Sequence, residues 1–191
     1  AWGLMLSTYT GQEDAVFGSV VSGRSVPLDG VESIVGLFVN LVPTRVKVVP
    51  DQALVEWLQE FQKSQVEQRA FEHVGLAEVK AWSDIPAAKT MFETVVVFQN
   101  WTGDLTSTRW NDDLTVEEVR GHHGSPGSPA AVVVIPADEL VLGISYDLNR
   151  YTAADVETML GCLRSLLESL PEGEAWKLRD LPLLNADDHQ L

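Results

Sequence analysis

The chain has 191 residues, of which 45% are hydrophobic, and a formal net charge of -15 at pH 7. This length suits one ordinary domain or one subdomain of a larger enzyme. Only 13 Lys and Arg residues are scattered along the chain, which excludes electrostatic capture of nucleic acid as its function.

The cysteine count and the hydropathy pattern point to a cytoplasmic protein. Cys162 is the single cysteine, so no internal disulfide can form, and no metal-ligand spacing surrounds it. No apolar run approaches the roughly 20 residues that a membrane span requires. We therefore expect a soluble protein without a metal site and without a membrane partner.

The first part of the chain predicts a helix followed by two strands. Residues 1–7 have helical composition, and Gly11 suits the left-handed residue that often ends a helix. Residues 16–22 are β-branched and apolar, with loop-forming residues after them, which predicts a buried strand that leads into an exposed loop. A second strand is predicted over about residues 36–48.

The middle of the chain predicts two helices and a buried strand. A long helix is expected from Pro50 to near Val74, because apolar residues recur there at the spacing of one helical face. A shorter amphipathic helix is expected over about 76–82, and 94–98 is typical of a strand buried on both faces. The face of the long helix is defined by Leu54, Trp57, Leu58 and Phe61.

The last third of the chain predicts loops, a hairpin, a helix and a docked tail. Residues 101–129 have loop composition, with one possible strand at 114–119, and an antiparallel hairpin is predicted over 130–135 and 140–146. Thr152 and Asp155 have the spacing of a capping box, which predicts a helix that ends at Pro171. Its apolar stripe comprises Val156, Met159, Leu160, Leu163, Leu167 and Leu170, and the tail is expected to dock through Leu178, Leu181, Leu183 and Leu184.

The histidines are the first candidates for a general base. His122 and His123 look like the start of an HHxxxDG acyl-transfer signature, but Gly127 and Ser128 stand where that signature requires Asp and Gly. A base must be held in a rigid shell, and a Gly-Ser-Pro loop does not provide one, so we expect no catalytic or metal-binding role for this pair. The other histidines are His73, expected near a helix C-terminus, and His189, in the tail.

The other candidate side chains favour structural roles. Cys162 lies beside the apolar stripe of the last predicted helix and is expected to be a buried, inert thiol. Trp57 and Trp82 fall on apolar helical faces, which favours the core over a ligand groove. The carboxylates that could form an acid–base pair are expected to lie on the solvent-exposed faces of helices. These carboxylates are Glu67, Glu72, Glu78, Asp84 and Glu93.

Several ordered segments resemble one known family over essentially the whole chain. They include a strand entry that ends in Val-Phe-Gly, a Val-Ser-Gly-Arg segment, an Ile-Val-Gly-Leu-Phe-Val-Asn segment, and a Phe-Glu-Thr-Val-Val-Val-Phe-Gln-Asn strand. They are similar to the corresponding segments of condensation domains from non-ribosomal peptide synthetases. The segments are residues 9–18, 20–24, 31–40, 75–86, 92–100, 142–147 and 180–184.

This resemblance implies a fold and a domain organisation. The fold would be α/β and like that of chloramphenicol acetyltransferase, with two subdomains and a mixed β-sheet flanked by helices in this half. Residues 1–171 would be the C-terminal subdomain, and 172–191 would begin the linker to a following adenylation domain. The motif HHxxxDG belongs to the N-terminal subdomain in this family, so this chain would lack a catalytic residue and be inactive alone.

The resemblance also implies a reaction and its partners. The whole domain would form an amide bond between a donor acyl thioester and an acceptor aminoacyl thioester. Upstream and downstream peptidyl carrier proteins would present both groups on 4'-phosphopantetheine arms, so no cofactor would be bound directly. The remaining partners would be the missing N-terminal condensation subdomain and the adjacent adenylation domain.

The resemblance assigns the substrate tunnel, its floor loop and its latch to five residues. Ser22, Gly23 and Arg24 fall in the floor and latch segment, Asn40 lies beside the tunnel, and Asn100 ends a strand. Ser25 and Leu41 depart from the usual Pro and Thr, and Gln99 and Trp101 replace the common Glu and Tyr, which leaves local loop shape and pocket polarity open.

Two other functions remain open at this point. The chain is also compatible with a degenerate condensation-like module that recruits carrier proteins or tailoring enzymes without chemistry. An epimerisation or cyclisation relative is the third possibility. An intact HHxxxDG motif upstream favours the enzyme, whereas replaced histidines favour recruitment.

Overall fold

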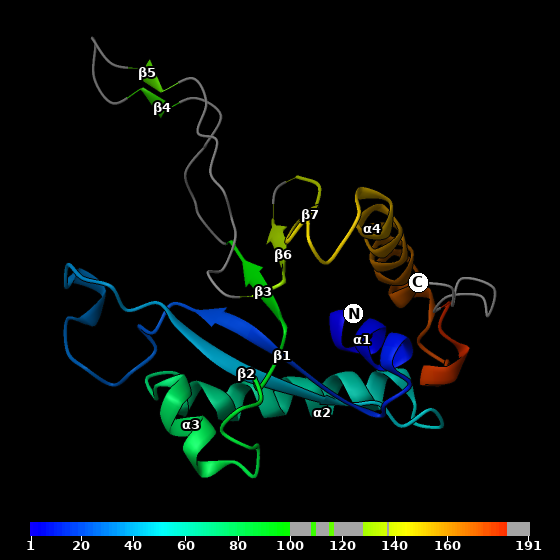
Figure 1. The fold of residues 1–191 in the computed structure, drawn as a ribbon, viewed down its shortest axis with the longest axis horizontal. Helices are drawn as coiled ribbons and strands as arrows, with labels where there is room; N and C mark the ends of the chain where they lie inside the picture. Colours follow the sequence, from blue (N-terminus) through cyan, green and yellow to red (C-terminus); the bar gives the residue numbers. More distant parts are fainter. Residues whose placement is uncertain (100–107, 110–114, 117–127, 137, 183–191) are drawn as a thin grey trace.

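The computed structural model describes residues 1–99, 108–109, 115–116, 128–136 and 138–182. Its centre is a five-stranded sheet in the order β2-β1-β3-β6-β7 (Figure 1). β1 (Asp14–Val21) pairs antiparallel with β2 (Asn40–Lys47) and parallel with β3 (Thr94–Phe98). β3 pairs parallel with β6 (Ala130–Ile135), which is antiparallel to β7 (Val141–Tyr146). The predicted mixed sheet and hairpin are confirmed.

Four α-helices flank this sheet in the described part of the chain, together with short 3-10 turns. α1 and α4 contact each other at one side, and α3 contacts β2 (Figure 1). A separate two-stranded pair joins β4 (Thr108–Arg109) to β5 (Thr115–Val116). The helices are α1 (Trp2–Thr10), α2 (Leu54–Gln68), α3 (Leu76–Trp82) and α4 (Ala153–Ser169), and the 3-10 turns are η1 (Val31–Ser33), η2 (Arg69–Phe71), η3 (Leu170–Glu172) and η4 (Leu178–Asp180).

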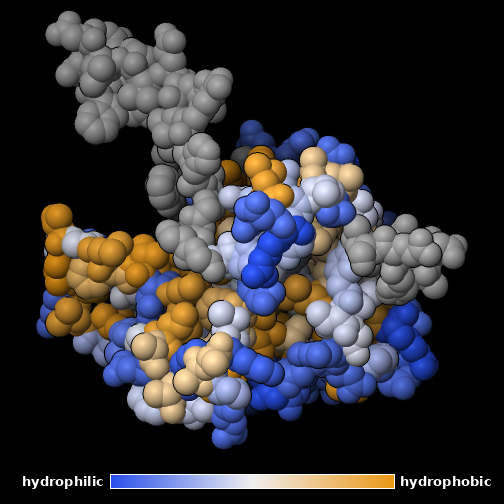
Figure 2. Space-filling model, viewed as in Figure 1, coloured by the Kyte–Doolittle hydropathy of each residue, from blue (hydrophilic) through white to orange (hydrophobic). Residues whose placement is uncertain are grey.

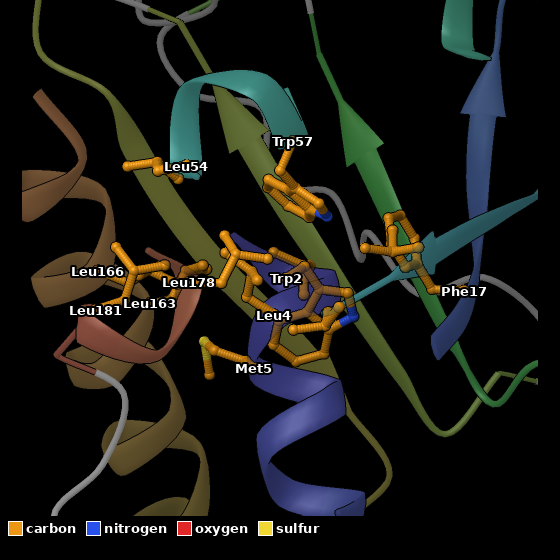
Figure 3. Packing of buried hydrophobic residues seen from close by; sticks show 13 residues of the cluster. Trp2, Leu4, Met5, Phe17, Leu54, Trp57, Leu163, Leu166, Leu178 and Leu181 are labelled. Carbon is orange, nitrogen blue, oxygen red and sulfur yellow. The ribbon is translucent and has the colours of Figure 1, made fainter. Parts of the chain in front are cut away.

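The core lies where α1, α4 and η4 meet the sheet (Figure 3). Leu4, Leu166 and Leu178 come from these three elements and are at most 1% exposed. Burial of one such side chain stabilises the fold by about 1.5–3 kcal/mol. The indole N–H of Trp2 donates to the hydroxyl of Thr94 at 3.0 Å, which ties α1 to β3 without leaving a buried polar group unpaired.

Side chains of α2 cover the open edge of β2. The indole N–H of Trp57 donates to the carbonyl of Lys47 at 2.6 Å, and the amide of Gln68 donates to the carbonyl of Pro43 at 2.7 Å. Pro43 has no N–H to offer a further strand. These three features protect the edge from pairing with another chain.

The segment after η3 is part of the fold rather than a free extension. The N–H of Leu54 donates to the carbonyl of Trp176 at 2.9 Å, and the N–H of Leu178 donates to the carbonyl of Gln52 at 3.0 Å. Asp51 pairs with Arg179 at 2.7 Å. The expected docking of the tail is confirmed for Leu178 and Leu181, which are buried, whereas Leu183 and Leu184 lie outside the described residues.

The predicted signals for the end of α1 and for the start of α4 are confirmed by local hydrogen bonds. Gly11 follows α1 with φ +64° and donates its N–H to the carbonyl of Thr8. At the start of α4, the N–H of Asp155 donates to the Thr152 hydroxyl at 3.2 Å, and the Thr152 N–H donates to the Asp155 carboxylate at 2.7 Å. The predicted strand at 114–119 is described only over Thr115–Val116.

Several predicted boundaries and faces are wrong. β2 begins at Asn40 rather than near residue 36, and α2 spans Leu54–Gln68 instead of reaching Val74, because η2 tightens the chain there. Leu58 is 38% exposed, since α2 packs through a narrow stripe that centres on Leu54 and Trp57. Phe98 is exposed at the end of β3, so this strand is not buried on both faces along its length. Leu166, outside the predicted stripe of α4, is fully buried.

Candidate functional site

The loop of residues 22–39 contains most of the predicted site residues. It connects β1 to β2, whose facing ends pair Val21 with Asn40. Gly23 stands at its start with φ +68°, and an ideal Cβ there would lie only 1.8 Å from the Phe38 carbonyl oxygen. Only glycine allows both this backbone conformation and this close approach, so residue 23 fixes where the returning chain crosses.

Arg24 closes the loop on itself. Its guanidinium lies over the Phe38 ring, 4.3 Å from the ring centroid, in a cation–π arrangement. The same group donates to the carbonyl of Val31 and, at 3.4 Å, to the carbonyl of Gly36. The Ser22 hydroxyl accepts from the Arg24 backbone N–H at 3.3 Å. The Arg24 guanidinium is therefore engaged inside the loop by three separate groups.

The outer part of this closed loop exposes apolar side chains. Val35 is 99% exposed and Leu37 is 91% exposed. The loop protrudes at the left of Figure 1, and Figure 2 shows a hydrophobic surface there. Exposed apolar patches of this kind mark interaction surfaces in soluble proteins. The other exposed apolar residues of the loop are Leu28, Ile34 and Val39.

Asn40 stands where the loop enters β2. Its side-chain amide nitrogen donates to the carbonyls of Glu72 at 2.7 Å and Val74 at 2.8 Å, and its side-chain oxygen accepts from the Leu41 N–H at 2.9 Å. Asn40 thus joins the start of β2 to the turn between η2 and α3. The residues Ser22 to Arg24 and Asn40 lie at the two ends of one loop, whereas Asn100 lies outside the described residues.

The histidines that can be placed do not form a reaction centre. His73 is exposed in the turn after η2. His122, His123 and His189 lie outside the described residues. Within residues 1–99, 128–136 and 138–182, and in the two short strands, there is no group of three His, Cys, Asp or Glu side chains that could hold a metal ion.

The remaining candidates have structural surroundings. Cys162 is a half-buried free thiol that accepts from the Tyr9 hydroxyl at 3.9 Å. Trp57 is in the core as predicted, and its ring stacks on Phe61 with the centroids 5.9 Å apart. Trp82 was expected in the core and is 73% exposed, because it is the last residue of the short helix α3, which buries none of its residues fully.

A hollow of about 880 Å³ was not foreseen from the sequence. It lies between α1, β1 and the segment before β3, and it is lined mainly by apolar atoms, with Met5, Tyr9 and Phe92 among its residues. The elements that form it are distant in the chain, so no local sequence signal marks it. Glu93 at its rim pairs with Arg150 at 3.6 Å, which places this carboxylate in an exposed ion pair.

The loop of residues 22–39 offers a binding surface rather than a reacting side chain. Acyl transfer to an amine needs a base near the nucleophile and exclusion of water. In the loop of residues 22–39, the charged guanidinium of Arg24 is held by carbonyls and an aromatic ring. The exposed side chains of the loop are largely apolar, with Asp29 and Glu32 beside them. This arrangement can form one side of a site that another element completes.

Comparison with known proteins identifies the family. The condensation-domain family matches the chain over residues 1–191. The chain belongs to the condensation-domain family. One of the linear gramicidin synthase proteins of Brevibacillus parabrevis is 32% identical over all of this chain, which corresponds to 4% of that protein. Bacitracin synthase 3 of Bacillus licheniformis is 30% identical over 99% of this chain and 3% of that protein.

Solved condensation domains have the same fold as this chain. The first condensation domain of the CDA synthetase superposes with a TM-score of 0.74 at 16% identity, and the match covers 96% of this chain and 40% of that chain. A structure described as CT gives a TM-score of 0.76 at 22% identity over 93% of this chain and 41% of that one. The chain therefore spans about two fifths of these structures.

The family assignment fits the residues that carried the sequence resemblance. Condensation domains of non-ribosomal peptide synthetases are acyltransferase-type enzymes, and the relatives named above are peptide synthases. No helix in the described ranges combines the length and hydropathy needed to cross a membrane.

Proposed function

We propose that this chain is the C-terminal subdomain of a condensation domain, over residues 1–171, with residues 172–191 beginning a linker to an adenylation domain. The observation that carries the proposal is that the whole chain matches the family yet spans only about two fifths of solved condensation domains. A loop that is closed internally and exposes Val35 and Leu37 supports a role as one face of a larger assembly.

The proposed reaction is amide formation between two carrier-bound thioesters. The acceptor amine attacks the donor carbonyl, a C–N bond forms, the C–S bond breaks, and the phosphopantetheine thiol leaves with a proton. Residues 22–24, Asn40 and Asn100 are proposed for the tunnel floor and latch. The base is proposed on the N-terminal subdomain, in the HHxxxDG motif. Upstream and downstream peptidyl carrier proteins supply both arms, and the domain works in the cytoplasm without a cofactor of its own.

The test is reconstitution of the reaction from two separately produced halves. The 191-residue chain is mixed with loaded donor and acceptor carrier proteins, with and without an N-terminal condensation subdomain, and the peptide thioester is measured by mass spectrometry. We expect product only when both halves are present. A histidine-to-alanine variant in the HHxxxDG motif of the added half is the control, and it should abolish product. Turnover by the chain without a partner would refute the proposal.

The second candidate function is recruitment without chemistry. It is favoured by the apolar side chains that the loop exposes, Val35 and Leu37 among them. If the two halves associate and bind carrier proteins but form no amide with any loaded pair, recruitment replaces condensation as the function.

A further inference from the structure

The side chain of Asn40 has no donor left for a substrate. An asparagine amide carries two N–H donors and one oxygen acceptor. Both donors are used at 2.7 and 2.8 Å on backbone carbonyls, and the oxygen accepts from the Leu41 N–H at 2.9 Å. A hydrogen bond from this amide to a substrate carbonyl would break one of the two bonds to the protein.

The two carbonyls that accept from Asn40 belong to a turn whose carbonyl oxygens need a hydrogen-bond donor from another element. Residues 72–74 follow η2 and precede α3, where the end of a helix leaves carbonyl oxygens without intrahelical donors. Glu72 and Val74 point these carbonyls toward β2, 32 and 34 residues away in sequence from Asn40. Asn40 therefore acts as a cap for this turn, supplied by another element.

Asn40 also fixes the place where the loop re-enters the sheet. It is the first residue of β2 and pairs with Val21, the last residue of β1. Phe38, two residues before it, receives both the close approach of Gly23 and the guanidinium of Arg24. The exit of the loop is thus held by the bonds of the Asn40 amide together with the pairing of Asn40 and Val21.

We propose that Asn40 is a positioning residue of the condensation reaction, which holds the 22–39 loop in place by anchoring its exit to the turn of residues 72–74. This proposal rests on the proposed function for its catalytic consequence, and on the three hydrogen bonds of the Asn40 amide for its structural part. Asn40 shapes the site through backbone that it holds, and the substrate does not touch its amide.

The chain supplies a matched control for this proposal. Gln68 also donates a side-chain amide to a backbone carbonyl, that of Pro43 at 2.7 Å, and also joins β2 to the α2 region. Its bond lies three residues into β2 and away from the loop exit. Asn40→Leu and Gln68→Leu therefore both remove hydrogen bonds from a side-chain amide to backbone carbonyls, two for Asn40 and one for Gln68. Both sets of bonds join β2 to a neighbouring element, and only the bonds of Asn40 lie at the loop exit.

The first measurement is made on the 191-residue chain. Backbone NMR order parameters of residues 24–38 should fall below about 0.6 in Asn40→Leu and stay near the rigid value of about 0.85 in Gln68→Leu. Asn40→Asp should mobilise the loop as well, because a carboxylate offers no donor to the two carbonyls. A loop that keeps its order in both Asn40 variants would overturn the proposal, whether or not the protein is an enzyme.

The second measurement is the rate of amide formation by the reconstituted halves. The comparison requires that the two variants have the same midpoint of urea unfolding. Asn40→Leu should then lower the rate of amide formation roughly tenfold to a hundredfold relative to Gln68→Leu, which is the scale expected when reacting groups are misplaced by about 1 Å. Equal rates for the two variants would show a purely structural role and overturn the proposal. If the wild-type halves make no amide, the proposed function fails, while the loop measurement still decides the anchoring role.

Discussion

The Gly23→Ala substitution tests how the loop of residues 22–39 is built. Gly23 has φ +68°, and its ideal Cβ would lie 1.8 Å from the oxygen and 2.8 Å from the carbon of the Phe38 carbonyl. These are backbone atoms, so no change of rotamer relieves the collision. The returning chain must move, and the Arg24 guanidinium must then leave the Phe38 ring or follow it.

A second glycine separates the two contributions to the loss of stability in Gly23→Ala. Gly11 has nearly the same φ, +64°, but nothing lies within 4 Å of its ideal Cβ. Gly11→Ala therefore carries only the strain of the left-handed backbone, about 1–2 kcal/mol. Gly23→Ala carries the same strain and an overpacking contribution, which adds about 1–3 kcal/mol. We expect Gly23→Ala to be the more destabilising by that second amount.

The assay is urea unfolding of both variants, combined with amide hydrogen exchange in residues 24–38. If the loop detaches before the core unfolds, part of the effect appears as faster exchange in the loop rather than as a lower midpoint. The reasoning is refuted if Gly23→Ala stays within about 0.5 kcal/mol of Gly11→Ala and leaves exchange in the loop unchanged.

Two further predictions concern the tail and the ion pair between β1 and β2. Leu178→Ala should lower the free energy of unfolding by about 2–5 kcal/mol, since Leu178 is only 1% exposed. The control is Leu148→Ala, which should change the free energy of unfolding little because Leu148 is 82% exposed. Equal effects of the two substitutions would show that the tail is not part of the core. The hydrogen bond from Arg45 holds the pKa of the Asp14 carboxyl below its usual value, so this pair stabilises the fold above the ordinary carboxyl pKa and loses its effect as the pH falls through the lower, folded pKa. Both side chains are well exposed, so Arg45→Gln should destabilise by less than about 1 kcal/mol at pH 6, and the loss should shrink as the pH falls through the lowered pKa of Asp14. A difference between the proteins that is independent of pH would contradict this account.

The loop of residues 22–39 shows why the family resemblance could locate the site residues but could not predict their contacts. Ser22, Gly23, Arg24 and Asn40 stand in segments that match family motifs, and the strand pairing brings them to the two ends of one loop. The partners of Asn40 are carbonyls of residues 72 and 74, and every residue has a carbonyl. No side-chain pattern in the sequence could single out those two.

The faces of the helices show the same limit. The period of apolar residues in α2 and α4 predicted that each helix would bury one side, and each does. The spacing of apolar residues did not predict that Leu58 of α2 and Trp82 of α3 would be exposed, or that Leu166 of α4 would be fully buried. Which part of an apolar stripe is covered depends on how wide the neighbouring element is and where it lies.

The sequence by itself determined the local elements, because each depends on bonds or spacings within a few residues. The capping box of Thr152 and Asp155, the left-handed Gly11 after α1, and the apolar run of β3 are of this kind. Tertiary structure alone decided the order of the sheet and the hollow beside α1. These features join residues that are distant in the chain, and their free energy depends on shape and burial that appear only when the elements pack.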